Sequence, residues 1–113
     1  MSLGTDSNAR ISMVEEMRWL EYGQRWAKEE RGVLRDADGQ VARRAFEAAT
    51  TGGARSLGVD GGEIRPGALA DLFTLDLDAP ELAGWSAETG LDGWVFGGGN
   101  AAVAEVCVGG RWG

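Results

Sequence analysis

The hydrophobic positions in the first third of the chain repeat at helical spacing. Met13, Met17 and Leu20 stand three or four residues apart, and two tryptophans and a tyrosine broaden the same stripe. This periodicity predicts an amphipathic helix over residues 12–31, because side chains three and four apart share one helix face. Ser12 is the expected N-cap, since a glutamate follows three residues later at the spacing of a capping box.

A second helical pattern follows a polar break. Alanines, a valine and a phenylalanine alternate with charged residues over residues 40–51. The pattern predicts a helix that ends at Gly52 and Gly53, because glycine favours the end of a helix. Residues 54–57 are compatible with one further turn, closed by Gly58.

The pattern changes after residue 60, where Gly and Pro residues separate short apolar runs. Residues 70–77, 93–96 and 103–108 are predicted as strands, and the last is rich in β-branched side chains. Glycines at 109–110 predict a hairpin turn into a short returning strand at 111–112. Helices followed by strands predict the α+β fold class.

Composition limits what the chain can be. Its 113 residues allow one ordinary domain, and a complete (β/α)8 barrel needs about 250 residues. There are 11 Lys and Arg against 18 Asp and Glu, so the net charge is −7, and there is no histidine. A chain without histidine and with one cysteine is not expected to build an ordinary zinc site alone.

The same composition limits its partners and compartment. The negative charge argues against nucleic acid or an anionic membrane surface, because both need clustered Lys and Arg. No apolar run approaches the 18 or so residues of a membrane span, and the first residues lack the character of a targeting segment. Cys107 is the single cysteine and is predicted to be a buried structural thiol, which fits a reducing, cytoplasmic compartment.

Asp6 is the residue with the clearest chemical potential. It lies among small residues, in the segment GTDSN ahead of the first predicted helix. It could present a free carboxylate that binds a metal or moves a proton. From the residues alone, a turn or capping role is favoured over that function.

Three glutamates of the first helix are candidate catalytic carboxylates. Glu15, Glu16 and Glu21 have arginines three or four residues away, which is the spacing of ordinary surface ion pairs. All three are therefore predicted to belong to a solvated face.

Three segments from residue 48 onward resemble a known family. Residues 48–58 read AATTGGARSLG and residues 62–72 read GEIRPGALADL, and the tail at 103–111 reads VAEVCVGGR. Together they resemble the C-terminal signature of the metal-dependent amidohydrolase superfamily. In these enzymes this region runs from the last barrel helices into a small β-sandwich.

The N-terminal segment narrows the resemblance. Residues 4–8 (GTDSN) and the charged helix that follows are similar to the formimidoylglutamate deiminases of histidine breakdown. In that family the aspartate of this segment ends the eighth barrel strand, ligates the single zinc and helps to deprotonate the attacking water. The resemblance assigns that catalytic and metal-binding role to Asp6.

The resemblance also implies what the chain lacks. The His-x-His pair, two further histidines, seven barrel strands and most substrate-binding groups have no counterpart here. The expected fold is therefore a fragment of a (β/α)8-barrel amidohydrolase, with the end of the barrel at 1–58 and C-terminal sandwich strands at 59–113. Zinc and a small-molecule substrate are expected for the full-length parent, and the fragment alone is expected to bind no metal and to be inactive.

The expected parent activity is hydrolysis of N-formimino-L-glutamate to N-formyl-L-glutamate and ammonia. Another amidohydrolase, such as a guanine- or cytosine-type deaminase or a chlorohydrolase, remains an alternative. So does a non-catalytic oligomerising module. Independently of the activity, the aromatic stripe of the first helix, with Trp19 and Trp26, predicts that copies of the chain pair into a homo-oligomer.

Overall fold

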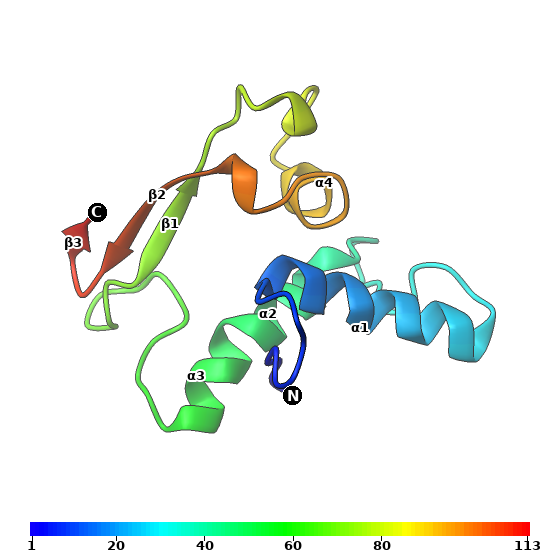
Figure 1. Ribbon diagram of the computed structural model, residues 1–113, viewed down its shortest axis with the longest axis horizontal. Helices are drawn as coiled ribbons and strands as arrows, with labels where there is room; N and C mark the ends of the chain where they lie inside the picture. Colours follow the sequence, from blue (N-terminus) through cyan, green and yellow to red (C-terminus); the bar gives the residue numbers. More distant parts are fainter.

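The computed structural model describes residues 1–113, which form four α-helices, two short 3-10 helices and one small sheet (Figure 1). The elements in chain order are α1 (Met13–Lys28), α2 (Ala42–Ala49), α3 (Thr51–Leu57), β1 (Leu72–Leu75), η1 (Pro80–Leu82), α4 (Gly90–Phe96), η2 (Asn100–Ala102), β2 (Val103–Val108) and β3 (Arg111–Trp112). Helices α1, α2 and α4 gather at one side, and the sheet extends from them to the other side, where α3 lies below it (Figure 1). The α+β class is confirmed.

The predicted first helix is confirmed as α1, apart from its last turn. The Ser12 hydroxyl accepts a hydrogen bond from the backbone N–H of Glu15 at 3.4 Å, so the predicted N-cap is in place. The helix ends at Lys28 because Glu29 turns into the left-handed region, with φ of 56°. Residues 29–31 therefore belong to the loop that follows.

The predicted second helix is divided in two, and the prediction that Gly52 and Gly53 end it is wrong. The break falls at Thr50, whose hydroxyl donates to the Phe46 carbonyl at 2.8 Å. Such a bond to the preceding turn bends a helix. Both glycines lie inside α3, and a Cβ at Gly52 would come within 2.1 Å of the Met1 carbonyl oxygen. Glycine at position 52 therefore lets the N-terminal segment pack against α3. Gly58 ends the helix as predicted.

The predicted strand at 93–96 is wrong, because these residues form the last half of α4. Leu91, Trp94 and Val95 stand at helical spacing, and the last two are buried. An isolated run of four apolar residues cannot distinguish a strand from a helix. Asp92 also joins α4 to α2: its carboxylate accepts the backbone N–H of Ala42 at 2.7 Å and that of Val41 at 3.3 Å.

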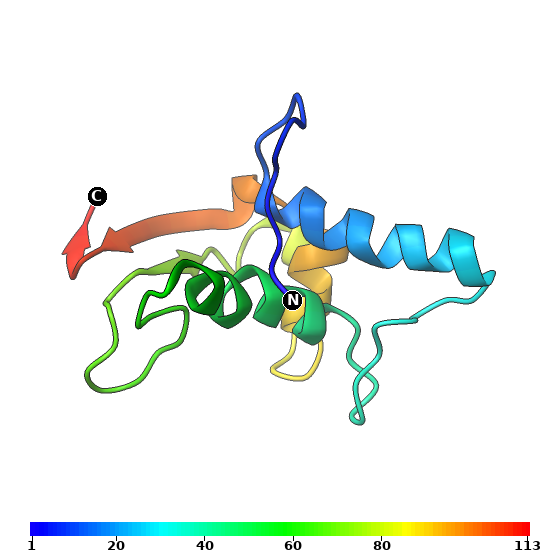
Figure 2. The ribbon, with the colours of Figure 1, turned by 90° about the horizontal axis from the view of Figure 1, so that it is seen from below.

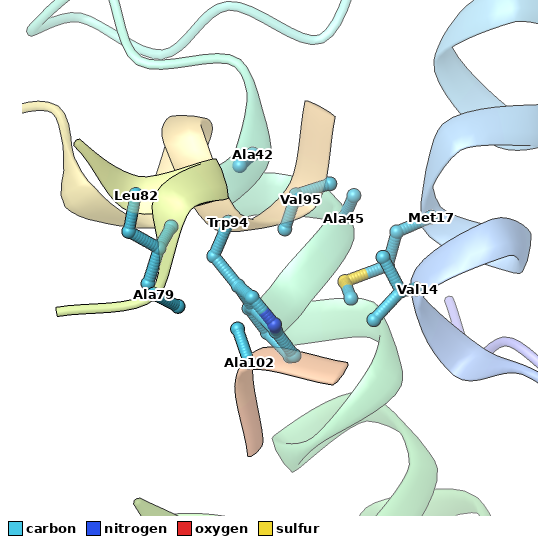
Figure 3. Close-up of a cluster of buried hydrophobic side chains, with 9 residues drawn as sticks. All are labelled: Val14, Met17, Ala42, Ala45, Ala79, Leu82, Trp94, Val95 and Ala102. Carbon is cyan, nitrogen blue, oxygen red and sulfur yellow. The ribbon is translucent and has the colours of Figure 1, made fainter. Parts of the chain in front are cut away.

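The core forms where α1, α2 and α4 meet, with η1 and η2 at its edge (Figure 3). Val14 and Met17 of α1 point toward Ala45 of α2. Trp94 is 4% exposed and fills the centre, and its indole N–H donates to the Gly99 carbonyl at 3.0 Å. The remaining buried side chains of the cluster are Ala42, Ala79, Leu82, Val95 and Ala102.

The sheet is antiparallel in the order β1-β2-β3. Leu72 of β1 and Trp112 of β3 both pair with Cys107 of the central strand. The predicted strand at 103–108, the hairpin turn after it and the burial of the Cys107 side chain are confirmed. The predicted strand at 70–77 is confirmed only over Leu72–Leu75.

The solvent-accessible surface of the chain is larger than expected for a self-contained domain of its size. It exposes 7642 Å², whereas a self-contained monomer of this size exposes about 5,900 Å². Trp19 is 65% exposed and Trp26 is 92% exposed on one face of α1. No helix is long and apolar enough to cross a bilayer. No barrel is formed within residues 1–113, and the core draws on residues from both sides of the predicted 58/59 division, which stays a prediction.

Candidate functional site

Asp6 lies in the loop of residues 1–12, which projects from the helices before the chain enters α1 (Figure 2). The backbone at Asp6 is left-handed, with φ of 41°. The N–H of Asn8 donates to the Thr5 carbonyl at 2.8 Å and so closes a turn around Asp6. The Asp6 side chain is exposed and makes no hydrogen bond or ion pair within the chain. Its carboxylate is therefore free to bind something outside this chain.

Both ends of this loop are anchored on helices. Before the turn, the N–H of Leu3 donates to the Ala48 carbonyl of α2 at 3.2 Å. After the turn, the Asn8 side-chain amide donates to Oε1 of Glu16 in the first turn of α1. A turn or capping role is the interpretation that the residues alone favoured for Asp6. The structure places Asp6 in a turn, but its side chain caps no helix.

The positions of the Cys, Asp and Glu side chains determine whether this chain can bind a metal ion by itself. No group of three or more His, Cys, Asp or Glu side chains converges anywhere in the chain. A carboxylate oxygen is an ordinary zinc ligand, and that of Asp6 is unpaired. Asp6 therefore fits as one ligand of a zinc site whose other ligands are supplied from outside these residues.

A cavity of about 480 Å³ lies beside the start of α1. Its lining includes Arg10, Ser12 and Glu15 from the entry to the helix and Gly98 to Asn100 from the segment after α4. Arg18 closes one side, and its guanidinium donates to the carbonyls of Val95 and Gly98. Asp6 is not among the lining residues, so the structure does not join this cavity to the predicted site.

Glu21 corrects a sequence prediction. It was expected on a solvated face, but its side chain is 0% exposed. Its carboxylate accepts the Arg25 Nε–H at 2.9 Å and three backbone N–H groups of the following loop: Gly32 at 2.8 Å, Leu34 at 3.0 Å and Val33 at 3.2 Å.

The hydrogen bonds set the ionisation of this buried group. Burial alone raises the pKa of Glu21, but the hydrogen bonds from Arg25 and from the N–H groups of Leu34, Gly32 and Val33 outweigh it. The pKa of Glu21 lies below its usual 4.5 as a result. All its acceptor capacity is used within the fold, so Glu21 is a structural carboxylate.

Comparison with known proteins decides the family. The sequence pattern of the Amidohydrolase family matches residues 1–113. This chain belongs to the amidohydrolase family. The resemblance noted in its sequence is thereby confirmed.

Three relatives show the range of the family. The formimidoylglutamate deiminase of Pseudomonas aeruginosa is 42% identical over 113 residues, which cover 99% of this chain and 25% of that protein. The crystal structure of an amidohydrolase from Brucella melitensis matches with a TM-score of 0.80 and 35% identity over 98% of this chain and 24% of that one. An adenosine deaminase from Xanthomonas campestris with bound zinc matches with a TM-score of 0.75 and 30% identity over 96% of this chain and 24% of that one.

This amidohydrolase chain is short compared with its relatives. It spans 18% to 25% of the length of the first curated relatives that it matches. The large exposed surface of the chain agrees with this short length, because the other three-quarters of such a protein would cover part of that surface.

Proposed function

We propose that this chain is the C-terminal part of a zinc-dependent hydrolase of non-peptide C–N bonds. The proposed substrate is N-formimino-L-glutamate, which would be converted to N-formyl-L-glutamate and ammonia in histidine degradation. The carrying observation is the 42% identity to the Pseudomonas aeruginosa formimidoylglutamate deiminase over 99% of the chain. By comparison, the zinc-bound adenosine deaminase is 30% identical over 96% of this chain, so the identity favours the formimino substrate.

Within that enzyme, the proposed role of this chain is to supply Asp6. Its carboxylate has two oxygens and no partner in the chain, so one can bind the metal while the other accepts a proton from the attacking water. Zinc, when bound, would supply positive charge that makes a water molecule more acidic and polarises the reacting carbon–nitrogen bond. The turn closed by Asn8 belongs to the loop that projects from the helices, and the Asp6 side chain is exposed there (Figure 2).

Most of the proposed active site lies outside this chain, which spans a quarter of the length of the Pseudomonas aeruginosa enzyme. The histidine ligands, the barrel and the groups that select the substrate would come from the other three-quarters of the protein. The 113 residues alone are therefore expected neither to turn over substrate nor to hold stoichiometric zinc.

A chimera tests the proposed reaction. The C-terminal quarter of the Pseudomonas aeruginosa enzyme is replaced by this chain, and ammonia release is measured with N-formimino-L-glutamate and with adenosine. We expect release from the formimino substrate only, and its loss in the Asp6→Asn variant. Asp78→Asn is the matched control, because Asp78 is also exposed and its side chain has no partner. The groups that select the substrate come from the Pseudomonas part of the chimera, so the experiment tests whether this chain completes a site that hydrolyses the formimino compound. A folded chimera that releases no ammonia from N-formimino-L-glutamate would overturn the proposal.

A further inference from the structure

The turn that carries Asp6 is tied to α1 by the side chain of its last residue, Asn8. We infer that Asn8 and Glu16 are positioning residues, which hold the Asp6 carboxylate in the orientation that metal ligation requires. This inference rests on the proposed function, because it gives Asp6 the role of a metal ligand. It assigns to Asn8 and Glu16 a role that they exert through Asp6.

The backbone shows why Asp6 needs such support. The left-handed region is uncommon for a residue with a Cβ, although Asp adopts it more readily than most, so contacts that hold the turn favour it. Asp6 has φ of 41° and an exposed side chain without partners, so nothing from its own side chain stabilises the turn. The hydrogen bond from the Asn8 N–H to the Thr5 carbonyl, at 2.8 Å, spans the turn and is the local contact that closes it.

The Asn8 side chain connects this turn to the core. Its amide donates to Oε1 of Glu16, a half-buried residue in the first turns of α1. Val14 and Met17, which are 2% and 1% exposed, pack this part of α1 into the core and so hold the backbone that carries Glu16. The Asn8–Glu16 hydrogen bond therefore fastens the projecting loop to α1 and limits its movement (Figure 2).

The neighbouring glutamate serves a different purpose. Glu15 pairs with Arg10, whose side chain is 76% exposed and lies beyond the Asp6 turn. The Arg10–Glu15 pair involves none of the turn residues Thr5 to Asn8, so it does not tie the turn itself to α1. Glu15 and Glu16 carry the same charge in the same helical turn, so Glu15 is a matched control for the positioning role.

The first experiment measures the turn without any metal. At positive φ the amide proton and Hα of one residue lie close together, which gives a strong intraresidue NOE. In NMR spectra of the 113-residue chain we expect that NOE at Asp6, its loss in Asn8→Ala and Glu16→Ala, and its retention in Glu15→Ala. Glu16→Gln should retain it too, because the amide oxygen still accepts from Asn8. A wild-type chain without the strong NOE, or one that keeps it in Asn8→Ala, overturns the inference.

The second experiment measures zinc affinity in the chimera by competition with a chelator. Loss of groups that orient a metal ligand typically costs about tenfold or more in affinity, so Asn8→Ala and Glu16→Ala are expected to weaken zinc by about tenfold. Glu16→Gln and Glu15→Ala should stay near the parent value. A chimera in which Asp6→Asn lowers affinity but Asn8→Ala and Glu16→Ala do not would overturn the positioning role alone. If Asp6→Asn also leaves affinity unchanged, the proposed metal role of Asp6 fails, and the positioning role fails with it.

Discussion

The loop before α1 and the middle of α1 hold carboxylates that differ in almost every respect. Asp6 lies in the loop, exposed and without a partner in the chain. Glu21 lies in the middle of the helix, 0% exposed, with one side-chain and three backbone donors around it. The comparison shows that burial and unmet hydrogen-bonding capacity distinguish a carboxylate that stabilises a fold from one available to a ligand.

Asp92 is an intermediate case. Its carboxylate accepts two backbone N–H groups at the start of α2, and the residue is half-buried. The cost of removing each carboxylate from the fold should therefore fall in the order Glu21, Asp92, Asp6. The following predictions use that order.

The largest effect is expected for Glu21→Ala. The substitution leaves three backbone N–H groups and the Arg25 guanidinium without their acceptor, and each buried unpaired donor costs about 1–3 kcal/mol. We expect the free energy of unfolding to fall by about 3 kcal/mol, measured by urea denaturation of the 113-residue chain. Glu30→Ala is the control, because Glu30 is exposed on the adjoining loop, and a similar loss there would remove the distinction.

Asp92→Ala should cost less. Two N–H groups at the helix start lose their acceptor, and removal of an N-cap acceptor typically costs about 1 to 2 kcal/mol. Asp92→Asn retains one acceptor oxygen and should lose less than Asp92→Ala in the same denaturation series. A loss for Asp92→Ala that exceeds that for Glu21→Ala would contradict the order.

Acidification should remove a smaller part of the stability that Glu21 provides. Its pKa is lower in the folded state than the usual 4.5, so the unfolded chain takes up a proton first as the pH falls. The contribution is present above the unfolded pKa and is lost as the pH falls through the folded pKa. Unfolding free energies of wild type and Glu21→Gln should therefore converge as the pH is lowered below 4.5, and a constant difference would contradict this.

The smallest effect concerns association. We propose that copies of the chain pair through the α1 face with Trp19 and Trp26, because 65% and 92% of these side chains are exposed. Sedimentation velocity should show a dimer or larger species at high concentration. Trp26→Glu should shift it toward monomer, with Trp85→Glu as the control on another surface. A wild type that stays monomeric would count against the proposal.

Local patterns explain which parts of this fold were predictable. The α1 helix has four turns of regular apolar spacing and a serine cap, and β2 has a run of β-branched residues with a glycine turn after it. The seven residues of α4 are too few for a periodicity to establish itself, so their last four resembled a strand. At Gly52, the reason for glycine is a contact with Met1, which no local pattern contains.

The polar groups were harder to predict because their partners are distant in sequence. Glu21 and Arg25 have the spacing of a surface pair, and only the folded loop at 32–34 buries the carboxylate. Asp92 caps a helix that begins 50 residues earlier. Asp6 was singled out by its resemblance to the amidohydrolases, and the Asn8–Glu16 contact that anchors its turn had no signal in the spacing of the residues.

The zinc content of the chimera with and without Asp6 tests the central claim most directly. After saturation with zinc and removal of excess metal, the account predicts about one zinc per chain in the parent chimera and in Asp78→Asn. In Asp6→Asn it predicts a large loss, with the unfolding free energy of the 113-residue chain changed by less than about 0.5 kcal/mol. Full zinc retention by Asp6→Asn would contradict the claim that this exposed carboxylate is a metal ligand.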